Sequence, residues 1–336
     1  MRQVSQQATT RRMMLRAGAA AGTAAALGAA GLFTARTASA ATAADSGTGV
    51  LPYPCGVTDI SHCTPEAAAI FRGVFTAKSE HNLAAFMSCF STAGAVYIDA
   101  CLPAVLSSWQ EINSEFTTVF GNAPASAISY PLTIAGGTRS AAIEFVDSPG
   151  FFGKEIRALS SVTFDSNQKI IRWVDYWDGR SSLLPNTFTA YPSDFRDSEQ
   201  NADPAVVRAA TRLQAAFAAG DATAAVALMS VDVVHEDMAA HTRLRGQFQA
   251  QRYYTRALGQ LPYGPGAALV HAEGSWQGGG YEWSAAPGAA PMRRGHTCIE
   301  LDETGKISRL IAIYDSSLLS YTAYQSLAGA AAEAPA

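Results

Sequence analysis

The sequence predicts an α+β protein built from two tandem units. In each unit the amphipathic helices come first and the β-rich segments follow, an order typical of α+β folds. The units start with the same signal, a capping residue followed by proline, at Thr64-Pro65 and Asp203-Pro204. They end with similar strands, KIIRWVDYWD at 169–178 and KISRLIAIYD at 306–315. Because equivalent positions lie 137 to 139 residues apart along the whole unit, we interpret the chain as a tandem duplication.

The helices and strands of each unit follow from residue type and spacing. Apolar residues three or four positions apart indicate helices, whereas β-branched and aromatic residues indicate strands. In the first unit we predict helices over 67–78, 83–90 and 109–120, with strands at 95–103 and 169–178. In the second unit we predict helices over 205–218, 222–229 and 247–258, with strands at 232–238 and 306–315. Further antiparallel strands are expected to complete each unit.

The first 40 residues resemble an export signal. Arg11-Arg12 precedes a run of small apolar residues over 17–35, and Ala38-Ser39-Ala40 is a typical cleavage pattern. The arginine pair indicates the twin-arginine route, so we expect a secreted protein. The predicted organisation is a signal peptide (1–40), an N-terminal extension (41–63), a first domain (64–184), a linker (185–202) and a second domain (203–325).

Composition and charge argue against several classes of protein. Removing the signal takes away five arginines and no acids, which leaves 19 Lys and Arg against 28 Asp and Glu, a net charge of −9. That charge disfavours nucleic acid or an anionic membrane as a partner. No other apolar run approaches the roughly 18 residues of a membrane span. The sequence has no dinucleotide or Walker fingerprint, no G-x-S-x-G motif and no zinc-type spacing, so we expect no cofactor and no metal.

The five cysteines are compatible with disulfides in an exported protein. Pairing of Cys55 with Cys63, and of Cys89 with Cys101, would close two short loops. Cys298 would then remain a free thiol on a strand.

The closing strand of the first unit carries the strongest candidate for chemistry. Side chains alternate along a strand, so Trp173, Asp175 and Trp177 share one face. A carboxyl group between two indoles lies in apolar surroundings, which should raise its pKa and suit proton transfer near neutral pH. The alternative is that Asp175 lies at a solvated strand end.

Three segments of the first unit together resemble a known group. They are YIDACLP at 97–103, EFVD at 144–147 and WVDYWD at 173–178. In this order and spacing they are similar to the cone-shaped fold of nuclear-transport-factor-2-like proteins, within it the limonene-1,2-epoxide hydrolase and polyketide-cyclase (SnoaL-like) branch. The resemblance covers 64–184 well and 203–320 more loosely. It implies two cone-shaped domains, each with three helices packed on a curved antiparallel sheet.

The resemblance also implies roles for individual residues. Asp147 takes the place of the family's acid, Asp175 that of its base, and Tyr97 that of the tyrosine that positions water. Asp99 stands where the family has asparagine, and Phe145 where it has the arginine that bridges the two acids. Without that arginine three carboxylates share one apolar pocket, and because like charges repel, at least one should stay protonated.

Other residues complete the expected pocket. Arg157 and Arg139 lie on segments that could supply the missing positive charge. Aromatic side chains should form the walls, and those on the third helix recur at helical spacing, which is equally typical of core. The predicted pocket residues are Trp173, Trp177, Trp109, Phe145 and Phe116.

The second unit keeps less of this pattern. Ala312 replaces the base, Trp283 and Ala285 take the arginine and acid positions, and only Asp237 remains. His235 lies two residues before Asp237 and could form a proton-transferring pair with it. We favour the simpler interpretation that His235 and His241 are solvated, and that His271 and His296 are half-buried strand residues. The glycines at 278–280 and the segment 284–291 are expected to form a flexible hairpin.

Two functions remain open from the sequence. The first is a cofactor-independent acid/base enzyme that acts on a small apolar substrate by epoxide opening, cyclisation or isomerisation, with Asp175, Asp147, Asp99 and Tyr97 at its centre. The alternative is a non-catalytic protein that binds a hydrophobic small molecule. A scaffold that uses the duplicated sheet as an interface is a third, weaker hypothesis. In each case the second domain would cover the first domain's sheet, and we expect a monomer that mimics a dimer.

Overall fold

The computed structural model describes residues 51–54, 56–102, 104–181, 201–286 and 292–332. The predicted signal peptide and almost all of the predicted linker lie outside these residues. The elements of the first half are β1 (Asp59–Cys63), α2 (Pro65–Ser79), α3 (Leu83–Ser88), β2 (Val96–Asp99), β3 (Ala104–Leu106), α4 (Trp109–Asn122), β4 (Ser129–Gly136), β5 (Ser140–Asp147), α5 (Pro149–Phe152), β6 (Ile156–Phe164), β7 (Ile170–Trp177) and the 3-10 turn η1 (Gly179–Ser181).

The second half repeats this series from its first helix onward. Its elements are α6 (Pro204–Ala218), α7 (Ala222–Ala227), β8 (Met229–Asp237), β9 (Thr242–Arg245), α8 (Gly246–Ala257), η2 (Leu258–Gln260), β10 (Ala268–Ser275), β11 (Gly278–Ser284), β12 (Arg294–Leu301), β13 (Ile307–Ile313), η4 (Ser316–Leu318) and α9 (Tyr321–Ala332). The predicted α+β fold class is confirmed.

The two sheets share one strand order. The first runs β1-β4-β5-β6-β7-β2-β3 and the second β10-β11-β12-β13-β8-β9, so they differ only by the extra edge strand β1. The register agrees as well, because Asp99 pairs with Asp175 between β2 and β7, and Asp237 pairs with Ala312 between β8 and β13. The 137–138-residue offset seen in the sequence therefore corresponds to equivalent places in the two sheets.

The first helix of each half begins where the sequence predicts, because a local hydrogen bond caps its N-terminus. Thr64 caps α2 by accepting a hydrogen bond from the Ala67 amide, and Asp203 caps α6 by accepting one from the Ala205 amide. Proline at the first helical position needs no amide partner, and its fixed φ suits the helix start.

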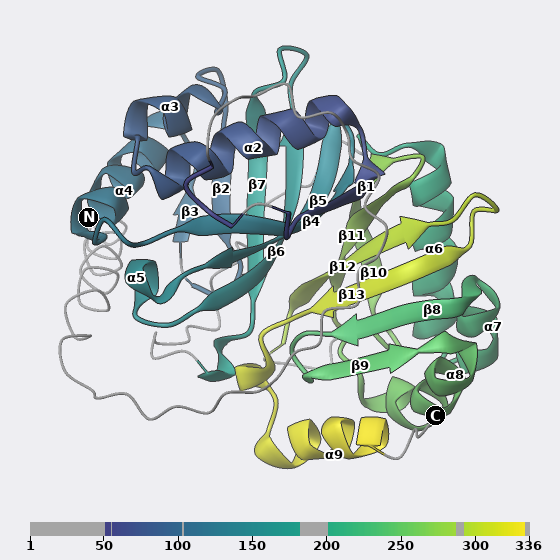
Figure 1. The fold of residues 1–336 in the computed structure, drawn as a ribbon. Coiled ribbons are helices and arrows are strands. Elements are labelled where there is room, and N and C mark those ends of the chain that lie inside the picture. Colours follow the sequence, from purple (N-terminus) through teal and green to yellow (C-terminus); the bar gives the residue numbers. More distant parts are fainter. Residues whose placement is uncertain (1–50, 55, 103, 182–200, 287–291, 333–336) are drawn as a thin grey trace.

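The two sheets lie face to face in the middle of the molecule, with α2–α4 on the outer side of the first and α6–α8 on the outer side of the second (Figure 1). One continuous apolar cluster crosses from sheet to sheet and includes Ile98, Val174 and Tyr176 from the first half. The opposite face of the first sheet packs against α2–α4 and forms a separate core, in which Trp173 and Trp177 lie. The first half's site therefore lies under its own helices, away from the junction of the sheets.

Several details differ from the expectations. Both sheets are mixed, because β1 runs parallel to β4, β2 to β7 and β8 to β13. A strand that follows a helix pair can join the far side of the sheet, which short-range sequence patterns do not show. Helices α5 and α9 were not predicted from the sequence.

The predicted flexible glycine hairpin is wrong for its first part. Gly278–Gly280 belong to β11 and are buried. A Cβ atom at Gly280 would come within 2.8 Å of the His296 ring and 2.5 Å of Glu273, so glycine is required for close packing of the sheet here. Residues 287–291 lie outside the described part of the chain.

The predicted Cys89–Cys101 disulfide is also wrong. Both side chains are free thiols, and Cys101 Sγ instead donates a hydrogen bond to the Trp177 carbonyl oxygen at 2.8 Å. Cys298 is free and buried, as expected. Cys63 is also a free, buried thiol, so its predicted pairing with Cys55, which lies outside the described residues, is wrong as well. In the described part of the chain no helix has the length and apolar character to cross a membrane.

Candidate active site

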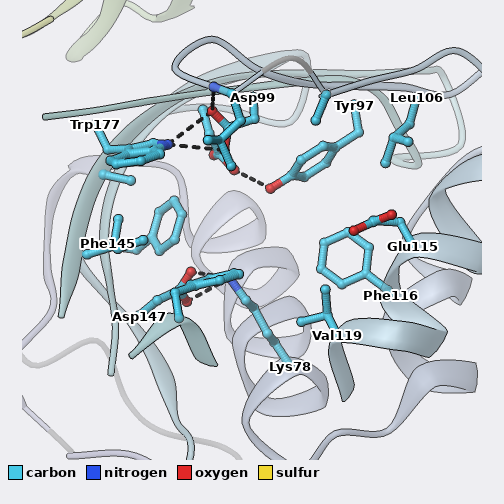
Figure 2. Close-up of a pocket in the computed structure, with 16 residues that line it drawn as sticks. Lys78, Tyr97, Asp99, Leu106, Glu115, Phe116, Val119, Phe145, Asp147 and Trp177 are labelled. Atoms are coloured by element: carbon cyan, nitrogen blue, oxygen red, sulfur yellow. Dashed lines mark hydrogen bonds and ion pairs between the residues drawn. The ribbon is translucent and has the colours of Figure 1, made fainter. Parts of the chain in front are cut away.

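A cavity lies between the helices and the sheet of the first half (Figure 2). Its volume is about 60 Å³, enough for a few water molecules or a small chemical group. Tyr97, Asp99 and Trp177 lie on one side of it, and Lys78 and Asp147 lie on the other. The lining residues are Lys78, Tyr97, Asp99, Leu102, Ala104, Leu106, Glu115, Phe116, Val119, Phe145, Asp147, Phe152, Ile156, Ala158, Asp175 and Trp177.

Asp175 is fixed on β7 by three side-chain donors. Its Oδ2 accepts a short hydrogen bond from the Tyr97 hydroxyl, and its Oδ1 accepts one from Ser160 and one from Trp173 Nε1 at 2.5 Å. The carboxyl group is 5 % exposed, which excludes the solvated strand end considered from the sequence. Burial raises the pKa of Asp175, although these hydrogen bonds oppose that rise.

Asp99 lies beside Asp175 on the neighbouring parallel strand β2. Its Oδ1 accepts hydrogen bonds from the backbone amides of Cys101 and Leu102 at 2.8 and 2.9 Å, and Trp177 Nε1 donates to both of its oxygens. Burial, and then the negative charge of Asp175, raise the pKa of Asp99 to about 7. The expectation that one carboxyl group of the cluster stays protonated therefore points to Asp99.

Asp147 is paired with a lysine that sequence reasoning missed. Lys78, in the last turn of α2, places Nζ 2.7 Å and 2.9 Å from the two oxygens of Asp147. Both side chains are buried, and the ammonium group also lies over the Phe145 ring, 4.8 Å from its centroid. Lys78 thus supplies the positive charge that the expected arginine would have supplied.

The proposed substitutes for that arginine lie elsewhere. Arg157 forms ion pairs with Glu144 and Glu236 at the junction of the two sheets. Arg139 is exposed and does not line the cavity. Both suggestions were wrong, because Arg157 lies on the face of β6 that is turned towards the other sheet, and Arg139 lies in the turn between β4 and β5.

Three of the five predicted pocket residues line the cavity, namely Phe145, Phe116 and Trp177. Trp173 lies behind it, where it packs on Phe71 and donates to Asp175. Trp109 is anchored by a hydrogen bond from Nε1 to the Met87 carbonyl oxygen at 3.2 Å. Trp173 and Trp109 therefore support the site without lining it.

Sequence reasoning had no signal for Lys78 or Ser160. A lysine in the last turn of a helix is normally a solvated partner of the helix dipole. Ser160 lies in a strand of small residues whose pairing with β7 is known only from the sheet register, where Ser160 faces Asp175.

The equivalent region of the second half is filled by aromatic side chains. Tyr253, Tyr254, Tyr263, Trp283 and Tyr314 are at most 1 % exposed. Asp237 accepts hydrogen bonds from the Ala240 amide at 2.8 Å and the Tyr263 hydroxyl at 3.1 Å, and burial raises its pKa to about 7.

The histidines of the second half are mostly more buried than expected. His235 is fully buried, so the expectation that it is solvated was wrong, and burial lowers its pKa to about 3. His241 is exposed as expected. His271 and His296 are buried rather than half-buried, and His296 Nε2 contacts Glu273. In the described part of the chain, neither ring nitrogen of His235 has a hydrogen-bond partner, so His235 and Asp237 do not form the pair considered from the sequence.

Comparisons with known proteins give a limited result. None of the protein families scanned matches the chain, and no curated protein matches it. Among solved structures, a SnoaL-like protein of unknown function from Burkholderia thailandensis has a TM-score of 0.30 at 16 % identity, over 34 % of this chain and 98 % of its own. A putative polyketide cyclase from Sinorhizobium meliloti scores 0.28 at 21 % identity, over 32 % and 93 %.

A third similar structure is a Mycobacterium tuberculosis protein in complex with estradiol-17beta-hemisuccinate. It has a TM-score of 0.29 at 12 % identity, over 33 % of this chain and 93 % of that chain.

Proposed function

We propose that the first-half cavity binds a small, largely apolar molecule and transfers protons on it, with Asp175 and Asp99 as the acid–base pair. One observation carries the proposal: two carboxyl groups from neighbouring strands line one cavity, and their proximity and burial raise the pKa of Asp99 to about 7. Groups that titrate near the working pH are the most effective general acids and bases.

The surroundings of each acid suggest its role. Asp175, stabilised as a carboxylate by three donors, acts as the base. Asp99 is protonated for part of the time near pH 7, and in this state it acts as the acid that donates a proton to the substrate. The ammonium group of Lys78, on the opposite wall, stabilises negative charge that develops on the substrate, since few water molecules are present to screen it.

This arrangement favours isomerisation or cyclisation over the epoxide opening that the resemblance implies. In that chemistry Asp147 would donate a proton to the epoxide oxygen. Here both Asp147 oxygens lie within 2.9 Å of Lys78 Nζ, so the carboxyl group is held in a contact with Lys78 and is not free to approach an epoxide oxygen.

Asp175→Asn tests the proposal on a panel of small enones, epoxides and polyketide-like substrates. We expect turnover to fall by about 10²–10⁴, the usual contribution of a general base. Asp237→Asn is the control, because Asp237 is a buried aspartate of the second half, at the place that corresponds to Asp99, and it does not line the cavity. Circular dichroism of both variants checks the fold. Undiminished turnover in Asp175→Asn would remove Asp175 from the mechanism.

A non-catalytic binding protein is the second candidate. This function is favoured because both carboxyl groups already have partners within the protein. Asp175 accepts three hydrogen bonds, and Asp147 is paired with Lys78. Native mass spectrometry of the purified protein, together with the activity panel, separates the two functions. A co-purified apolar ligand without turnover of any substrate would favour binding.

We also propose that one exported chain is the functional unit, with its two halves packed as a pseudo-dimer. The shared strand order and the ion pairs between the sheets support this arrangement. Analytical ultracentrifugation should give the mass of a single chain, and a dimer mass would contradict the proposal.

A further inference from the structure

A groove lies beside the cavity, where the two halves meet. Its volume is about 240 Å³, several times that of the cavity. The first half contributes residues of 152–157, Trp177 and Asp178, and the second half contributes Met238, His241 and Ile313. Phe152, Ile156 and Trp177 line both the groove and the cavity, so these three side chains alone form the wall that they share.

Asp178 gives the groove a specific polar feature. Its Oδ1 accepts hydrogen bonds from the backbone amides of Ser316 at 2.8 Å and Arg180 at 3.3 Å, which fixes the carboxyl group. Its Oδ2 is buried and, among the described residues, accepts no hydrogen bond of good geometry. His241 Nε2 lies 3.9 Å from Oδ2, too far for a hydrogen bond.

Burying an acceptor that has no donor costs free energy. A ligand that supplies the missing donor therefore binds more tightly. The groove also offers apolar contacts, because Met238 and Ile313 are buried side chains of the second half and Phe152 and Ile156 are half-buried. Charged side chains line the groove beside these apolar residues, namely Lys154, Glu155 and Arg157, so the groove fits a ligand with an apolar segment and a hydrogen-bond donor at its end.

We propose that the ligand of the first-half cavity is an elongated apolar molecule that extends past Phe152 and Ile156 into this groove and donates a hydroxyl hydrogen bond to Asp178 Oδ2. The inference rests on the proposed function, and it gives the second half a role in specificity. Met238 and Ile313 contact the distal part of the ligand, whereas the region of the second half that corresponds to the first-half cavity is filled by buried aromatic side chains.

Two series of probes test the inference, namely 1-alkanols and α,ω-alkanediols of six to twelve carbons, measured by isothermal titration calorimetry. Each diol differs from its alcohol only by the terminal hydroxyl. In the wild-type protein we expect one chain length at which the diol binds at least about fivefold more tightly, the usual net gain from one hydrogen bond.

Asp178→Asn is the decisive variant. It keeps the size of the side chain and the Oδ1 acceptor, but it replaces Oδ2 by an amide donor. The diol preference should fall severalfold, because the hydrogen bond from the hydroxyl to a carboxylate is replaced at best by a weaker neutral bond from the amide to the hydroxyl oxygen, whereas alcohol affinity should be unchanged. Met238→Trp should weaken the longer probes only, because it fills the groove. Glu303→Gln, on the exposed β12–β13 turn, is the control that should behave like the wild type.

The possible outcomes separate this inference from the proposed function. If alcohols and diols bind equally at every length, and Phe116→Trp weakens both by filling the cavity, the groove inference is overturned and the cavity proposal stands. If no probe of either series binds, both proposals fail.

Discussion

Asp99 and Asp237 show how one residue type behaves at equivalent places of two sheets. Each accepts a hydrogen bond from a backbone amide in the following turn, and burial raises the pKa of each to about 7. Only Asp99 has a second carboxyl group beside it, because Ala312 stands where Asp175 would be. The turn contacts thus account for an aspartate at both places, whereas the acid pair exists only in the first half.

Asp99→Asn should make the protein more stable at pH 8 by about 1–2 kcal/mol, with little effect at pH 4. The folded-state pKa of about 7 lies above the ordinary 3.8, so the folded protein binds the proton more tightly between these values. Its stability therefore falls as pH rises through this window, and asparagine removes that loss. Solvent in the cavity moderates the effect, because Asp99 is half-buried.

Urea unfolding at pH 4, 6 and 8 measures this difference. Asp237→Asn should show a similar pH dependence without any change in ligand binding. A difference between Asp99→Asn and wild type that stays constant with pH would contradict the raised pKa.

At the residue scale, sequence reasoning located most of the acid cluster and missed its partners. Alternation along 169–178 placed Asp175 between two tryptophans, and the family resemblance added Asp147, Asp99 and Tyr97. All four residues line the cavity. Lys78 and Ser160 could not be found, because their roles depend on how α2 crosses the sheet and on the β6–β7 register. Such long-range geometry has no local pattern.

The helix α2 joins the site to the core of the first half. Its buried residues include Phe71 and Phe75, which pack against Trp173, and Lys78, which pairs with Asp147 on β5. The position of this helix therefore fixes the charge on one wall of the cavity. A shift of α2 along the sheet would separate Lys78 from Asp147.

Lys78→Met should destabilise the protein by about 3–5 kcal/mol, because it leaves the Asp147 carboxylate buried without a partner. The double variant Lys78→Met/Asp147→Leu should recover most of this loss, since it removes both charges. Lys169→Met, at an exposed lysine, is the control and should change stability by less than about 0.5 kcal/mol. Chemical denaturation measures all three, and equal losses in the single and double variants would argue against a stabilising pair.

At the element scale, the helices agreed with their predicted ranges to within a few residues. Capping residues, N-terminal prolines and apolar spacing are local features, and local features fix where helices begin. The parallel pairings of β2 with β7 and of β8 with β13 were not predicted, because strand pairing depends on contacts between residues that are far apart in the sequence. The predicted domain limits of 64–184 and 203–325 remain a prediction.

The junction of the two sheets holds a network of buried ion pairs. Glu282 contacts Arg172 and accepts a hydrogen bond from Tyr176 at 2.7 Å, both from the other half. Burial works to raise the pKa of Glu282, but the positive charges of Arg172 and Arg294 outweigh it and lower the pKa to about 2. The association of the halves therefore depends on an ionised glutamate.

Acid should weaken this junction in a defined window. The folded-state pKa of Glu282 lies below the ordinary 4.5, so its contribution is complete above pH 4.5 and is lost as pH falls towards 2. Glu282→Gln should be about 2–4 kcal/mol less stable than wild type at pH 7, because Arg172 loses its ionised partner. The difference should shrink steadily below pH 4.5 in urea titrations. A gap of the same size at pH 2.5 and pH 7 would contradict this account.

The shared strand order of the two sheets affects which amino-acid substitutions each half can accept. In a symmetric pair of separate molecules, every substitution is made twice and must suit both copies. Here the two halves are covalently joined, so Ala312 can stand opposite Asp237 while Asp175 stays opposite Asp99. The second half can therefore line part of the groove beside the first half's cavity, and dilution cannot separate the two.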